Sequence, residues 1–156
     1  MGLKNIAVFA TQQTVKSRAY AQRARILDAE ISVQEIAFSG DLVRDIESLL
    51  PVRHCRSEED FQELMKLYAS DGWNCDSVPW QELVDRYFSD MPATVDPQTR
   101  GILLGCTHYS YLSKPLQRLF PDIALIDPSE EAAEKMGDYM QRKNIEVVSE
   151  GLLRFL

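Results

Sequence analysis

An uninterrupted apolar run from Gly101 to Gly105 (GILLG) is the segment that most restricts the fold. A strand with one face in water would alternate apolar and polar residues, and this run does not alternate. Strands that are apolar on both sides are typical of parallel sheets, because helices cover both faces of such sheets. The run therefore predicts a central parallel strand in an α/β protein.

Apolar strands and amphipathic helices alternate along the rest of the chain. The expected strands are at residues 4–10, 31–37, 101–105, 123–126 and, last and short, 145–148. The expected helices are at residues 15–28, 41–50, 58–69, 80–88, 110–120 and 130–142. Strand–helix repetition of this kind predicts a three-layer α/β fold, with a parallel sheet of about four strands between flanking helices.

The stretch from about 51 to 97 is the least regular part of the chain, and it is expected to be a helical insertion in a domain of residues 1–129. Its aromatic side chains are more typical of an ordinary core than of a binding surface. Residues 130–156 are expected to add a C-terminal helix and a short strand.

Charge and cysteine content exclude several classes of function. The 156 residues carry a net charge of -7, and no basic face or stripe suits a nucleic-acid backbone. No apolar run approaches the length of a membrane span. The three cysteines, Cys55, Cys75 and Cys106, lack CxxC spacing, which indicates reduced thiols in a cytoplasm. His54, Cys55 and Cys75 fit no zinc-binding pattern, so no metal site is expected.

The chemistry is expected in the loops that follow the strands, because open parallel sheets form their sites beyond the carboxyl ends of the strands. Three loops qualify, at Thr11–Thr14, Ser39–Asp41 and Cys106–Tyr109. A thiol between a strand and a helix is favoured as thiolate, and a histidine two residues on can act as acid or base. Cys106 with His108 could then attack a carbonyl or abstract a proton. The alternative is that Cys106 is an inert, buried apolar residue.

Three segments, in the same order, resemble the glutamate racemases of the aspartate/glutamate racemase family. Residues 101–127 (GILLGCTHYSYLSKPLQRLFPDIALID) resemble the second cysteine motif, an apolar strand followed by Gly-Cys-Thr-His-Tyr-Pro-x-Leu. Residues 6–20 (IAVFATQQTVKSRAY) resemble the Ala-Thr-x-x-Thr-Val-x-Ser segment. Residues 37–47 (AFSGDLVRDIE) lie where the family has Ala-Cys-Pro and a helix that carries a glutamate, and the tail from 147 also resembles the family's ending. The resemblance implies a flavodoxin-like racemase domain.

The resemblance also implies catalytic roles for three residues. Cys106 matches the second acid/base cysteine of the family, and His108 matches the histidine that assists it. Glu47 falls where the family has the carboxylate partner of this histidine. These three residues are the candidate catalytic group.

Three threonines match positions that contact or line the family's substrate cleft. Thr107 matches a substrate-contacting threonine, and Thr11 and Thr14 match the threonines of the first loop. Capping of the following helix is the alternative role for Thr14.

The family interconverts L- and D-glutamate without a cofactor, and D-glutamate serves peptidoglycan synthesis in the cytoplasm. One cysteine acts on each face of the α-carbon, so the implied ligand is an acidic amino acid, glutamate or aspartate. The family's first half, with its own catalytic cysteine loop, has no match here. The chain therefore resembles a second half alone, a half-site without activity of its own. Residues 130–156 would then pack on the first domain.

Several departures and alternatives stay open. Ser110 replaces the motif's proline, Ser39-Gly40 replaces Cys-Pro, and Pro128 interrupts the Ile-Asp-Ser ending. The favoured interpretation is a fragment or a truncated racemase. A stand-alone descendant used for binding or regulation is a second interpretation. A homodimer, or a pair with a separately encoded first half, is a third. A Cys-His hydrolase or transferase is the alternative from another class.

Overall fold

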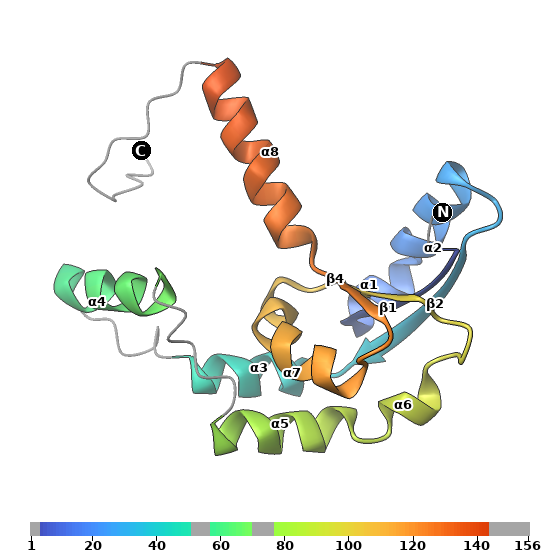
Figure 1. Ribbon diagram of the computed structural model, residues 1–156, viewed down its shortest axis with the longest axis horizontal. Coiled ribbons are helices and arrows are strands. Elements are labelled where there is room, and N and C mark those ends of the chain that lie inside the picture. The colour runs from blue at the N-terminus through green and yellow to red at the C-terminus, as the bar shows by residue number, and fades with distance from the viewer. Residues whose placement is uncertain (1–3, 51–56, 70–76, 144–156) are drawn as a thin grey trace.

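A four-stranded parallel sheet forms the centre of the computed structural model, which describes residues 4–50, 57–69 and 77–143 (Figure 1). Its strands lie in the order β2-β1-β3-β4, and every neighbouring pair is parallel. Their bounds are Asn5–Thr11 (β1), Ser32–Phe38 (β2), Gly101–Leu104 (β3) and Ala124–Ile126 (β4). The predicted α/β class with a parallel sheet of about four strands is confirmed. The strand expected at 145–148 lies outside the described residues.

The apolar run that restricted the fold is an inner strand, as predicted. β3 pairs with β1 on one side and β4 on the other, and the side chains of Ile102 and Leu104 are buried. Phe9 of β1 lies beside Leu104 in the register. Ile102 and Leu104 point to one face of the sheet and the half-buried Leu103 to the other, so β3 is apolar on both faces, as expected of an inner parallel strand.

One face of the sheet carries the main hydrophobic core. It is covered by α3 (Gly40–Leu49), α5 (Val78–Phe88), the 3-10 helix η2 (Thr107–Leu112) and α7 (Ser113–Leu119), and Figure 1 shows α3, α5 and α7 together on this side. The predicted helix at 110–120 thus begins three residues earlier, as a 3-10 turn. The core side chains come from the strands and from each of these four helices, and they include Phe9, Phe38, Leu42, Ile46, Trp80, Leu83, Phe88, Ile102, Leu104, Tyr109, Leu112 and Leu116.

The opposite face is covered by two short helices where the sequence predicts one helix over 15–28. α1 (Gln12–Ser17) and α2 (Ala19–Leu27) meet at Arg18, whose φ of 56° lies in the left-handed region. The Arg18 Nε atom lies 3.1 Å from the Glu35 carboxylate, and the Glu35 side chain is only 2% exposed. A non-glycine residue rarely adopts this left-handed conformation. The ion pair places the Arg18 side chain against a buried carboxylate of β2, and neither oxygen of that carboxylate accepts a hydrogen bond among the described residues.

The described part of the stretch from 51 to 97 contains the helices α4, α5 and α6. α4 (Glu58–Ala69) coincides with its predicted range. α5 packs with Trp80, Leu83, Val84 and Phe88 into the main core, and a four-residue helix, α6 (Met91–Thr94), follows it without having been predicted. Burial of Trp80 and Phe88 confirms the core interpretation for these two aromatic residues. The domain limits inferred from the sequence stay a prediction.

The last described helix, α8 (Pro128–Arg142), runs away from the sheet (Figure 1). Met136 and Tyr139 lie one turn apart on it, and their side chains are 60% and 48% exposed. Within the described ranges, no helix combines the length and apolar character needed to cross a membrane.

Candidate functional site

The loops after β1 and β3 are neighbours, because these strands pair in parallel and end at the same edge of the sheet. The Gly105 N–H donates to the Phe9 carbonyl at 2.8 Å, which extends the pairing one residue beyond β3. Cys106 therefore follows directly on the paired edge, in the position that open parallel sheets use for ligand sites.

Gly105 has a physical reason to be glycine. A Cβ atom built there would lie 3.1 Å from side-chain atoms of Val8, Ala10 and Tyr20 at once. Such contacts are tighter than ordinary van der Waals packing on three sides, so a side chain there would require all three neighbours to move by a few tenths of an ångström. Gly105 thus sets how closely the Cys106 loop lies to the sheet.

Cys106, His108 and Glu47 form a relay. The Cys106 Sγ atom lies 3.8 Å from His108 Nδ1, and His108 Nε2 lies 3.0 Å from Glu47 Oε1. An ionised carboxylate only accepts hydrogen bonds, so Nε2 carries the proton in the neutral ring and Nδ1 faces the thiol as an acceptor. A nucleophile or base next to a histidine that a third group orients is the arrangement used for proton transfer and for nucleophilic attack.

The relay is assembled across the sequence by helix packing. Cys106 lies just after β3, and His108 lies on η2. Glu47 comes from the last turn of α3, which packs against η2. The side chains of His108 and Glu47 are 32% and 42% exposed, so the relay is open to solvent on one side.

The threonines of the first loop bond to each other. Thr11 is the N-cap of α1 and accepts from the Thr14 N–H at 3.4 Å, and the two hydroxyl oxygens are 3.1 Å apart. The capping residue is therefore Thr11, whereas the sequence interpretation gave that alternative to Thr14. The pair lies at the end of β1, the strand next to β3, but its hydrogen bonds remain within its own loop. Thr107 is exposed at the start of η2.

Two further side chains beside the relay were not predicted. Tyr109 is fully buried, and its hydroxyl has no hydrogen-bond partner among the described residues. Burial, and then the charge of the Cys106 thiolate, raise the pKa of Tyr109, so this phenol stays neutral beside the thiol. At the end of β4, partial burial raises the pKa of Asp127, but hydrogen bonds from Ser129 and Ser110 outweigh it and the net pKa is lowered.

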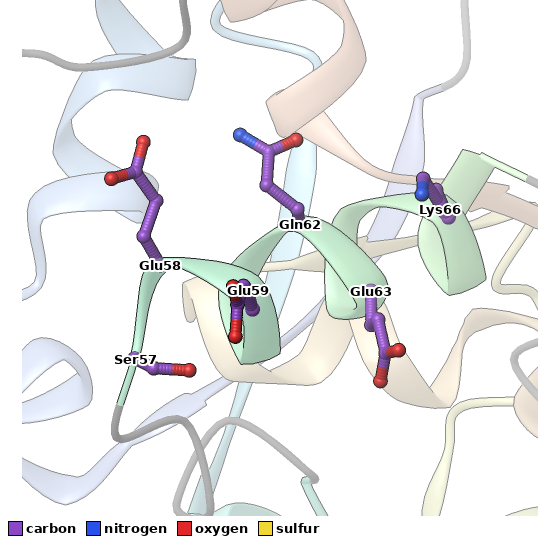
Figure 2. Close-up of a pocket in the computed structure, with 6 residues that line it drawn as sticks. All are labelled: Ser57, Glu58, Glu59, Gln62, Glu63 and Lys66. Atoms are coloured by element: carbon purple, nitrogen blue, oxygen red, sulfur yellow. The ribbon is translucent and has the colours of Figure 1, made fainter.

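Two surface hollows of the described structure lie away from the relay. One follows α4 and is lined by Ser57, Glu58, Glu59, Gln62, Glu63 and Lys66. Figure 2 shows these side chains pointing in different directions from a single helix, so they do not converge on a ligand. Another is lined by Lys114, Gln117, Arg118 and Pro121 around α7. Neither includes a residue of the relay.

Metal binding has no support in the described part of the chain. No group of three or more His, Cys, Asp or Glu side chains is arranged there to hold a metal ion. His54, Cys55 and Cys75, which the sequence left as a remote metal-binding combination, lie outside the described residues.

Comparison with known proteins gives a consistent result. No protein-family model matches the chain. The glutamate racemase of Fusobacterium nucleatum is 28% identical over 132 residues, which cover 85% of this chain and 39% of that protein. The glutamate racemase of Aquifex aeolicus is 25% identical over 142 residues, 90% of this chain and 43% of that protein. The chain thus spans about two fifths of the length of these relatives.

Solved structures support the same fold. The crystal structure of glutamate racemase from Francisella tularensis, in complex with D-glutamate, aligns with a TM-score of 0.61 at 20% identity, covering 95% of this chain and 45% of that one. A glutamate racemase isoform from Bacillus anthracis aligns with a TM-score of 0.60 at 23% identity, covering 92% of this chain and 44% of that one.

Proposed function

We propose that the chain, which is similar to part of the glutamate racemases, provides one of the two acid/base groups that racemise an acidic amino acid. Racemisation needs a base on one face of the α-carbon and an acid on the other. Cys106 is the group on one face. The observation that carries this assignment is the relay from Cys106 through His108 to Glu47.

Each member of the relay has its own task. His108 Nδ1 takes the proton of the Cys106 thiol and leaves a thiolate that can remove the α-proton. Glu47 holds the ring by Nε2 and stabilises the imidazolium as it forms, as carboxylates do in comparable triads. The same thiol can return the proton. No cofactor enters these steps. Preorganised groups around the carbanion would stabilise its negative charge.

The ligand is proposed to be glutamate, with aspartate as the alternative. A relative's structure contains D-glutamate. Thr107 is exposed beside Cys106, and Thr11 and Thr14 place two hydroxyls at the end of the neighbouring strand. Hydroxyl and N–H donors of this kind suit the carboxylates of an acidic amino acid. The biological role would be the cytoplasmic supply of D-glutamate for peptidoglycan.

The second acid/base group is proposed to come from outside the chain. The apolar side chains of Met136 and Tyr139 on α8 are exposed, and residues 130–156 are the part expected to pack on the family's first domain. A first domain, separately encoded or otherwise supplied, would cover this helix and face Cys106. A homodimer that brings two Cys106 thiols to one substrate is the alternative.

A chiral assay tests the half-site directly. Purified chain incubated with L- or D-glutamate should leave the enantiomeric composition unchanged, since one thiol serves one face only. Net interconversion that disappears in Cys106→Ala but persists in dilute monomer would show that the chain holds both groups and is not a half-site. Interconversion that appears only as the chain dimerises would support the homodimer.

A Cys-His-Glu hydrolase or transferase is the second candidate, because the same relay suits a nucleophile. The two candidates differ in what the thiol attacks. An acyl-transfer enzyme should be acylated at Cys106 by an activated ester and then turn over, whereas a racemase half should exchange the α-proton of its ligand. A binding or regulatory descendant should bind glutamate in calorimetry and do neither.

A further inference from the structure

Helix α3 is held on two sides by elements that are far apart in the sequence. It packs against α5 and against η2, and its buried residues Leu42 and Ile46 face the core between them. Asp45 and Glu47 flank Ile46. Residues two positions apart on an α-helix are rotated by about 200° about its axis. The carboxylates of Asp45 and Glu47 therefore leave the helix on opposite sides of Ile46.

Asp45 is bound to the end of α5 by two side chains. Tyr87 donates its hydroxyl to Asp45 Oδ2 at 2.8 Å, and Arg86 Nη1 donates to the same oxygen at 3.0 Å. Burial and the hydrogen bond to Asp45 raise the pKa of Tyr87, so its hydroxyl remains a donor well above neutral pH. Hydrogen bonds to an ionised acceptor are among the stronger ones in proteins.

The opposite flank of the same helical turn carries the relay. Glu47 Oε1 lies 3.0 Å from His108 Nε2. Rotation or sliding of α3 would move Asp45 and Glu47 together, because the helix backbone between them is rigid. The bonds from α5 to Asp45 therefore limit where Glu47 can lie relative to His108.

We propose that Asp45, Tyr87 and Arg86 are positioning residues that set Glu47 against His108, which makes α5 a support of the site. The only role predicted for the aromatic residues of α5 was core packing. This inference rests on the proposed function, since it concerns the relay that the function uses. None of the three residues touches the reacting atoms.

Two readouts report on the relay without requiring racemase activity. The ¹⁵N shifts of the His108 ring give the fraction of the Nε2–H tautomer. The rate of iodoacetamide labelling of the Cys106 peptide, followed by mass spectrometry at fixed pH, gives the reactivity of the thiol. Glu47→Gln serves as the reference variant that breaks the relay itself.

Tyr87→Phe and Asp45→Asn are expected to shift His108 toward a mixture of tautomers and to slow labelling by about two- to thirtyfold, the range for a change of coupling at a distance. Arg44→Ala is the matched control, because it removes an exposed ion pair with Asp41 from the same helix. It should leave both readouts unchanged, and thermal melts should show all variants folded.

The outcomes distinguish a failure of the positioning role from a failure of the proposed function. If Glu47→Gln changes both readouts and Tyr87→Phe and Asp45→Asn change neither, the positioning role is wrong and the proposed function is untouched. If Glu47→Gln changes nothing either, the relay is absent in solution, which overturns the positioning role and removes the main support of the proposed function. A change in Arg44→Ala equal to that in Tyr87→Phe would also overturn the positioning role, because it would show a general response of α3.

Discussion

Cys106 takes its chemical setting from residues at very different distances along the chain. His108 is two positions away, and Glu47 is 59 positions away, on helix α3, which packs against η2. Gly105 lies close to Val8 and Ala10 of β1, and Thr11 caps the start of α1. Single residues therefore control the site mainly through backbone position.

Gly105→Ala should lower the free energy of unfolding by about 1–3 kcal/mol, the usual cost of an added methyl group in a well-packed place. The reason is that three side chains lie 3.1 Å from the new Cβ. Urea denaturation followed by circular dichroism measures it. Gly137→Ala on α8 is the matched control, since nothing lies within 4 Å of its Cβ. Equal midpoints for both variants would refute the tight approach at Gly105.

Arg18 should respond differently to alanine and to glycine. Both substitutions leave the buried Glu35 carboxylate without its partner, which costs about 1–3 kcal/mol or more. Glycine tolerates the left-handed backbone, so Arg18→Gly should be about 1 kcal/mol more stable than Arg18→Ala. Urea midpoints of the two variants decide the matter, and identical values would mean that the left-handed turn is absent in solution.

At the residue scale, the sequence allowed part of the site to be predicted. Cys106 and His108 follow from a thiol and an imidazole placed after an apolar strand. Glu47 could be named only from a resemblance, because nothing in its helix marks a partner 61 residues away. Tyr109 and Asp127 were missed, since their environment depends on burial and on a neighbouring strand.

At the scale of elements, the periodicity of apolar residues predicted most strands and helices, and local interactions decided where they begin. Thr107–Leu112 forms a 3-10 turn before α7, and the helix expected over 15–28 breaks at Arg18. The break lies at one left-handed residue that is not glycine, so the residue type gave no sign of it. α6 is too short to produce a periodic signal.

Asp127 should control the start of α8, where it accepts from the Ser129 N–H at 2.9 Å and the Ser129 hydroxyl at 2.7 Å. Asp127→Ala should destabilise the helix by about 0.5–2 kcal/mol, the cost of a lost N-cap. Amide hydrogen exchange along α8 measures this change. Ser129→Ala should have a smaller effect, because the backbone N–H remains as a donor.

The contribution of Asp127 should also depend on pH. Because the pKa of Asp127 is lowered in the folded state, its stabilisation is fully present above the ordinary titration range of an aspartate and is lost as pH falls through the lowered value. The difference in α8 protection between the native chain and Asp127→Ala should therefore shrink in acid. A difference that grows in acid would contradict the assigned direction.

At the scale of the whole molecule, the described structure combines a packed hydrophobic core with apolar side chains that are exposed on its last helix. The sheet carries a packed layer of α3, α5, η2 and α7, whereas α8 extends away with Met136 and Tyr139 exposed. The chain spans 39% and 43% of the two curated relatives compared. These features support the proposal that the chain provides one of the two acid/base groups and that the other comes from outside it.

The most direct measurement is proton exchange at the α-carbon of glutamate in heavy water, followed by ¹H NMR for each enantiomer separately. One thiol can remove and return a proton on one face, so a single enantiomer should exchange slowly, without inversion, and Cys106→Ala should abolish the exchange. Exchange of both enantiomers, exchange that persists in Cys106→Ala, or no exchange of either enantiomer would contradict the assignment of Cys106 as a racemase acid/base.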